Sequence, residues 1–152
     1  MALILIVDDD DIVSEAASQV LINAGHACGW VSGAEEASDL LRWRRPDILL
    51  LDQDMPGMTG GKFLRQLRSS PKFYDLPVIM FTGMKGAEDE QQALYNGAQD
   101  YIRKPFDPKF LLWRVNHVLE TSAARTGHKD LGEFLAEQQR LNKNFTPQRS
   151  SA

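Results

Sequence analysis

Three short runs of consecutive apolar residues mark the chain, at Leu3–Val7, Ile48–Leu51 and Val78–Phe81. Polar and apolar residues do not alternate within these runs, as they would in a strand with one face in water. Such runs are typical of strands buried on both faces, which occur in parallel sheets covered by helices. Ala27–Val31 and Gln99–Arg103 are weaker candidates for two further strands. The pattern therefore predicts a sheet of five strands.

The segments between these runs follow the helical spacing of three and four positions. Thr59 and the pair Asp107–Pro108 are typical of helix starts, whereas Gly25, Pro46 and Gly97 are typical of helix ends. We expect helices over approximately residues 12–24, 33–45, 59–67, 86–96 and 108–120.

Strand and helix alternate five times along residues 1–120. This alternation predicts an α/β domain with a doubly wound parallel sheet, helices on both of its faces and right-handed crossovers. The site of chemistry then lies at the carboxyl ends of the strands. Residues 121–152 predict a linker followed by an amphipathic helical tail, because Leu131, Phe134, Leu135 and Leu141 have helical spacing.

Charge and composition narrow the possible functions. The net charge of −4 over 152 residues argues against a broad nucleic-acid surface. No apolar run has the length of a membrane span, and no basic segment of a signal peptide precedes the first strand. Cys28 is the only cysteine, which excludes an internal disulfide and is compatible with a reducing compartment. We therefore expect a cytoplasmic protein that neither binds nucleic acid directly nor enters a membrane.

Chemically active side chains follow the predicted strands. Asp8 and Asp9 end the first strand, Asp52 the third and Thr82 the fourth, and Lys104 follows the fifth. These ends meet at one edge of a parallel sheet, so the side chains are expected to share one shallow pocket. Crowded carboxylates repel one another unless a cation lies between them, and Mg2+ suits a site of carboxylates, a backbone carbonyl and waters. A carboxylate neutralised in this way can attack a phosphoryl donor.

The acidic run continues with Asp10 and Asp11. We expect these two residues to start a helix and not to bind metal, because acidic side chains favour a helix N-terminus.

The same strand ends carry a family resemblance. The matching segments are Val7–Asp9, Leu51–Gly60, Phe81–Gly83 and Gly97–Phe106, in this order and each at the end of a predicted strand or over it. Together they resemble the receiver domain of two-component response regulators over approximately residues 1–120. The resemblance implies a flavodoxin-like (βα)5 fold. It also implies a signalling switch that is not an enzyme, beyond catalysing its own phosphorylation and dephosphorylation.

The resemblance implies roles for individual residues. Asp52 would accept a phosphoryl group from a sensor histidine kinase or a phosphotransfer protein. Asp9 and Asp52 would bind Mg2+ directly together with the backbone carbonyl of Asp54, while Asp8 would act largely through water. Lys104 would pair with the phosphoryl oxygens.

The resemblance also implies a conformational switch. Thr82 would hydrogen-bond the phosphoryl group, and Tyr101 would move with it. From its pattern alone, Tyr101 is better explained as a half-buried strand aromatic, and only the resemblance implies the switch role. Lys104 and Pro105 would be joined by a cis peptide bond. The face formed by the fourth helix, fifth strand and fifth helix would then change and regulate a partner or output.

Two alternative functions stay open on these residues. Asp52-Gln53-Asp54 also resembles the DxD motif of haloacid-dehalogenase-like phosphatases, which use an aspartyl-phosphate and Mg2+. Against it, the motif follows the third strand and not the first, and neither a cap domain nor a further acidic motif follows downstream. A degenerate receiver that acts only as an interaction module is the second alternative. The complete set of acidic residues and the lysine count against it.

A partner surface is predicted on the fifth helix. Its apolar residues at positions 111, 112, 115 and 118 have core-facing spacing, which leaves Phe110 and Trp113 on a more exposed stripe. Exposed aromatic residues are enriched at protein contacts. We expect this stripe to contact either a second subunit, in a homodimer through this face, or the tail beyond residue 120.

Overall fold

The computed structural model describes residues 1–83 and 97–126. Five parallel strands form one sheet in the order β2-β1-β3-β4-β5. Its strands are β1 (Leu3–Val7), β2 (Ala27–Val31), β3 (Ile48–Asp52), β4 (Val78–Thr82) and β5 (Asp100–Arg103). The parallel sheet confirms the predicted α/β fold. Each strand lies within its predicted segment or extends it by one residue.

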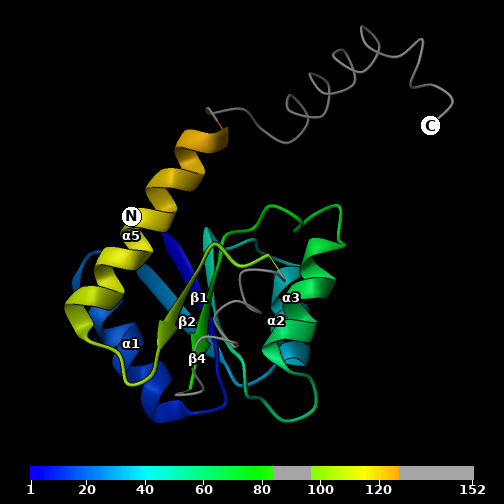
Figure 1. Cartoon of the computed structure of the whole chain (residues 1–152), viewed down its shortest axis with the longest axis horizontal. Coiled ribbons are helices and arrows are strands. Elements are labelled where there is room, and N and C mark those ends of the chain that lie inside the picture. The colour runs from blue at the N-terminus through cyan, green and yellow to red at the C-terminus, as the bar shows by residue number, and fades with distance from the viewer. Residues whose placement is uncertain (84–96, 127–152) are drawn as a thin grey trace, which may run out of the picture. The chain divides into compact units, whose positions relative to one another are not determined.

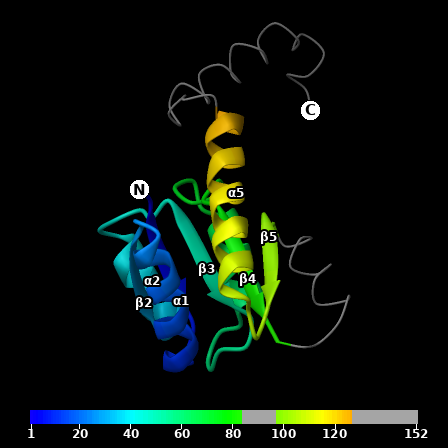
Figure 2. The ribbon, with the colours of Figure 1, turned by 90° about the vertical axis from the view of Figure 1, so that its left-hand side faces the viewer.

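Helices lie on both faces of this sheet (Figures 1 and 2). The described helices are α1 (Asp11–Asn23), α2 (Ala34–Leu41), α3 (Gly60–Arg68) and α5 (Pro108–Thr126). α1 and α5 pack on one face, and α2 and α3 on the other. A first compact unit, Met1–Leu119, contains the whole sheet. The helix predicted over residues 86–96, and the part of the predicted linker and tail that follows residue 126, lie outside the described residues.

Successive residues of one strand enter opposite layers of the core. In β1, Leu5 and Val7 pack with α2 and α3, whereas Ile4 and Ile6 pack with α1 and α5. β3 and β4 are buried at every position, which explains why their sequences show no alternation of polar and apolar residues. β2 lies at the edge of the sheet and is only partly buried, which matches its weaker apolar pattern.

Side-chain caps set the starts of two helices. Asp10 is the N-cap of α1, and its side chain accepts hydrogen bonds from the backbone N–H groups of Ile12 and Val13. Its predicted role at a helix start is confirmed. Thr59 caps α3 in the same way, accepting from the N–H group of Lys62. Both caps satisfy N–H groups that have no partner within the helix.

Two helix ends differ from their predicted positions. α2 ends at Leu41 and not close to Pro46, because the backbone N–H groups of residues 43 and 44 both donate to the Leu40 carbonyl and close the helix in a turn. α5 continues past residue 120 to Thr126. No glycine or proline interrupts the sequence from residue 109 to residue 126, so no backbone signal ends the helix earlier.

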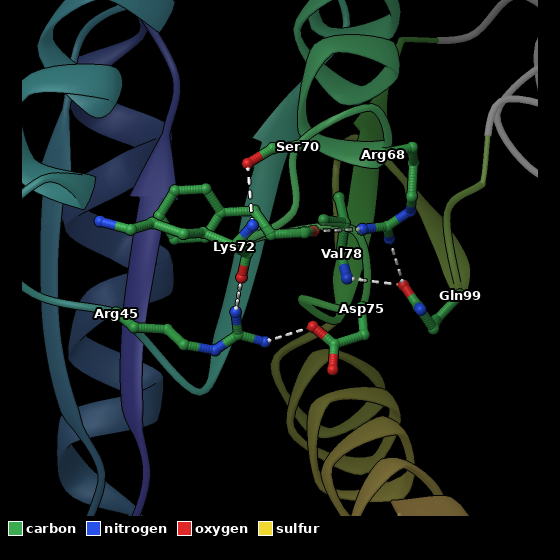
Figure 3. A network of polar contacts seen from close by, with 8 residues as sticks. Arg45, Arg68, Ser70, Lys72, Asp75, Val78 and Gln99 are labelled. Carbon is green, nitrogen blue, oxygen red and sulfur yellow. Dashed lines mark hydrogen bonds and ion pairs between the residues drawn. The ribbon is translucent and has the colours of Figure 1, made fainter. Parts of the chain in front are cut away.

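A polar network joins the end of α3 to the start of β5 (Figure 3). Arg68 donates to the backbone carbonyls of Gly97 (2.9 Å) and Phe73 (3.2 Å) and to the side-chain oxygen of Gln99 (3.0 Å). The same oxygen of Gln99 accepts from the backbone N–H group of Val78 at 2.7 Å. Gly97 has a φ of +106°, and a Cβ atom there would lie only 2.9 Å from Arg68 Nε. The network therefore fixes where β5 begins relative to β4.

The pairing of β4 with β5 places Lys104 beyond the carboxyl end of β5, at the end of the sheet opposite to Gln99. Thr82 pairs with Arg103, and the backbone N–H group of Lys104 donates to the Thr82 carbonyl at 2.8 Å. The peptide bond between Lys104 and Pro105 is cis, as expected. Within residues 1–83 and 97–126, no helix combines the length and apolar character needed to cross a membrane.

Candidate functional site

Three carboxylates meet at the carboxyl edge of the sheet. Asp8 follows β1 and is fully buried, Asp52 ends β3 and is 3% exposed, and Asp9 is exposed. One carboxylate oxygen from each of the three lies within 4.8 Å of the others. The parallel strands bring these residues together although Asp9 and Asp52 are 43 positions apart in the sequence. The predicted convergence is therefore present.

Lys104 places a cation beside two of these carboxylates. Its Nζ atom lies 2.8 Å from Asp8 Oδ2 and 3.0 Å from Asp52 Oδ1. The lysine side chain is 21% exposed, so the ammonium group is held at the mouth of the pocket with its partners behind it. Thr82 ends the neighbouring strand β4 and is buried. The predicted acids and lysine thus meet in one small region, and Thr82 ends the next strand at the same edge of the sheet.

Burial and charge shift the titration of this group. The pKa of Asp52 is raised to about 7, mainly by burial and also by the negative charge of Asp8. Hydrogen bonds from Lys104 and from the backbone of Asp54 oppose this rise. For Lys104, burial lowers the pKa, but hydrogen bonds and charge interactions with Asp8 and Asp52 outweigh burial and leave the pKa raised. An additional cation would stabilise the charged form of Asp52 in the same way as the lysine does.

The donor set fits a hard divalent cation. Carboxylate oxygens are the ligands that Mg2+ prefers, and these three carboxylates carry more negative charge than one ammonium group offsets. The next two acidic residues take no part, since Asp10 caps α1 and Asp11 is its exposed first residue. This division of the acidic run agrees with the sequence analysis. Asp8, Asp9 and Asp52 could therefore hold a metal ion.

Two residues that the sequence pattern did not single out shape the loop after Asp52. Gly60 is the first residue of α3, and a Cβ atom there would overlap the carbonyl oxygen of Asp52. Gln53, which follows Asp52, accepts a hydrogen bond from the backbone of Gly61 at 3.0 Å. A polar side chain directly after a buried strand was the available signal for Gln53.

The residues predicted to transmit a signal lie on β5 and α5. Tyr101 is partly buried against the core layer of α2 and α3. Phe110 and Trp113 are 44% and 58% exposed, and their rings stack along α5. The guanidinium of Arg114 lies over both rings and pairs with the carboxylate of Asp100. The exposed aromatic stripe is present, and it borders a pocket of about 450 Å³ between β5 and α5.

Solved structures define the class of protein to which this fold and site belong. A putative response regulator from Chloroflexus aurantiacus matches with a TM-score of 0.76 and 34% identity, over 78% of this chain and 98% of that one. The chemotaxis response regulator CheY4 of Vibrio cholerae matches with a TM-score of 0.72 and 29% identity, over 78% and 98%. The architecture is that of a flavodoxin-like receiver domain.

Sequence relatives agree with the structural comparison. The chain is 40% identical over 128 residues to the phosphate regulon transcriptional regulatory protein PhoB of Pseudomonas aeruginosa, covering 84% of this chain and 54% of PhoB. It is 36% identical over 149 residues to the heme response regulator HssR of Staphylococcus aureus, covering 93% of this chain and 65% of HssR. The chain thus spans between about half and two thirds of the length of these relatives. Residues 4–116 match the response regulator receiver domain family, and the chain belongs to this family of two-component systems.

Proposed function

We propose that this receiver domain is a phosphoacceptor switch in which Asp52 receives a phosphoryl group from a sensor histidine kinase or a phosphotransfer protein. The observation that carries the proposal is the ammonium group of Lys104, which bridges the buried carboxylates of Asp8 and Asp52 at 2.8 Å and 3.0 Å. An ammonium group in this place can pair with phosphoryl oxygens once they arrive at Asp52.

The chemistry requires a nucleophile and a balance of charge. An oxygen of Asp52 forms a bond to phosphorus, while the bond between phosphorus and the donor's histidine nitrogen breaks. A bound Mg2+, held by Asp9, Asp52 and the carbonyl of Asp54 with Asp8 acting through water, would offset the charge on the phosphoryl oxygens. Lys104, which follows β5, supplies a second positive charge beside Asp52. The protein then catalyses only its own phosphorylation and dephosphorylation.

The phosphoryl group changes the local charge by about −1.5 to −2 at neutral pH. The hydroxyl of Thr82, at the end of β4, donates a hydrogen bond to a phosphoryl oxygen, and Tyr101 of β5 turns inward behind Thr82. β5 and α5 change with them, and the stripe of Phe110 and Trp113 contacts a second subunit or the chain's own tail. This face regulates the partner or output.

Labelling with a small phosphodonor tests the proposal. Incubation with acetyl phosphate and Mg2+ is expected to add one phosphoryl group to the wild type and none to Asp52→Asn, measured by intact-mass spectrometry. Asp39→Asn is the control, because Asp39 is an exposed acid on α2 outside the site. Undiminished labelling of Asp52→Asn would refute the acceptor assignment. Donor turnover without an adduct would indicate a phosphatase, and neither labelling nor turnover would indicate a degenerate receiver.

A further inference from the structure

Gln53 follows the acceptor and joins three elements of the structure. Its backbone N–H group donates to the carbonyl of Phe81 in β4 at 3.0 Å, and its own carbonyl accepts from the N–H group of Gly60 at 3.0 Å. Its side-chain oxygen accepts from the N–H group of Gly61, also at 3.0 Å. One residue thus ties the end of the acceptor strand to β4 and to the first turn of α3.

The first turn of α3 depends on this residue. A helix leaves its first N–H groups without partners inside the helix. In α3, Gln53 satisfies the N–H groups of Gly60 and Gly61, and the hydroxyl of Thr59 satisfies that of Lys62 at 3.2 Å. Gly60 and Gly61 are both buried, so water is poorly placed to replace the side-chain amide. Removing that amide would leave a buried donor unsatisfied.

The same turn controls the neighbourhood of Asp52. α3 is packed so closely on Asp52 that a Cβ atom at position 60 would lie 2.1 Å from the Asp52 carbonyl oxygen. The segment that carries Asp54 is short and is anchored by Gln53 at one end and by α3 at the other. Loss of the bond between Gln53 and Gly61 would therefore free the segment that carries Asp54 from the first turn of α3.

We propose that Gln53 is a positioning residue for the phosphoacceptor site. Its side-chain amide locks the first turn of α3 to the acceptor strand, and this fixes both ends of the short segment that carries Asp54. The inference rests on the proposed function, because the carbonyl of Asp54 serves there as a metal ligand. Gln53 touches neither the metal nor the phosphoryl group and acts through the loop.

The test compares two variants that each remove one cap of the same helix. Gln53→Met keeps the side-chain length but removes the acceptor for Gly61, whereas Thr59→Val keeps the shape but removes the acceptor for Lys62. Amide hydrogen exchange reports whether each cap is lost, and calorimetric titration reports Mg2+ affinity. Gln53→Met is expected to weaken Mg2+ binding by about tenfold, the scale of lost outer-shell support. Thr59→Val is expected to change Mg2+ affinity less than about twofold while it destabilises α3.

Each outcome decides the inference. Equal losses of Mg2+ affinity in both variants, or unchanged affinity in Gln53→Met, would overturn the positioning role. Gln53→Glu retains an acceptor for Gly61 and is expected to keep the amide protected from exchange. If Gln53→Met does not fold, Gln53→Asn, whose amide is one methylene shorter, is compared with Thr59→Val in the same way. A wild type that binds no Mg2+ and takes no label refutes the proposed function itself, whatever the variants do.

Discussion

Replacing Lys104 with methionine tests the electrostatic account of the site. The ammonium group lies 2.8 Å and 3.0 Å from two carboxylates whose side chains are 0% and 4% exposed. At such distances, two unit charges attract by about 5 kcal/mol at an effective dielectric constant of about 20, which desolvation partly offsets. Removing one partner of a buried ion pair costs about 3–5 kcal/mol. We expect Lys104→Met to lower the free energy of unfolding by this amount at neutral to alkaline pH.

The pH dependence of this loss makes the prediction specific. The pKa of Asp52 is raised from 3.8 to about 7, so the folded protein binds a proton more tightly than the unfolded chain does. Wild-type stability therefore falls as the pH rises from about 4 to about 7. Without Lys104, which lowers the pKa of Asp52, the folded pKa moves higher and the fall continues above pH 7. The difference between wild type and variant should be larger at about pH 8.5 than at about pH 5.5, by about 1–2 kcal/mol.

Urea denaturation in the presence of a chelator, at both pH values, measures this difference. Lys109→Met is the matched control, because Lys109 is exposed at the start of α5, and it should cost less than about 0.5 kcal/mol. Mg2+ added to Lys104→Met should restore part of the lost stability by replacing the missing positive charge. A loss that is the same at both pH values would show that Lys104 acts through packing, and the electrostatic reasoning would be wrong.

Substitutions in the acidic run, at the start of α3 and on α5 test three other features of the structure. Asp9→Ala should abolish Mg2+ binding in a calorimetric titration, whereas Asp11→Ala should leave it intact; equal losses would contradict the assigned division of the acidic run. Gly60→Ala should lower the free energy of unfolding by about 2–3 kcal/mol in urea, because the added methyl group overlaps the acceptor's backbone carbonyl, and a neutral result would mean that α3 shifts freely. Phe110→Ala/Trp113→Ala should change the sedimentation or thermal stability of the full chain, and no change in either would remove the proposed partner surface.

The strands and the main site residues could be predicted from sequence because their signals are local. A strand buried on both faces needs apolar residues at every position, and this pattern identified β1, β3 and β4 directly. Parallel strands end at one edge, so Asp8, Asp9, Asp52, Thr82 and Lys104 could be assigned to one pocket from their places after those strands. The cap role of Asp10 followed from its position before a helix.

Only the tertiary structure decided the features that depend on distant neighbours. The raised pKa of Asp52 arises from burial and from the charge of Asp8, which is 44 positions away in the sequence. How deeply the Asp52 carboxylate is buried depends on the packed fold and cannot be read from a local pattern. Glycine is needed at position 60 because the packing of α3 brings this residue close to the backbone carbonyl of Asp52. Two of the three hydrogen-bond acceptors of Arg68, the carbonyl of Gly97 and the side-chain oxygen of Gln99, likewise lie 29 and 31 positions away in the sequence. Periodicity records which face of an element is buried, whereas these contacts depend on how the elements pack, and that is set by the whole fold.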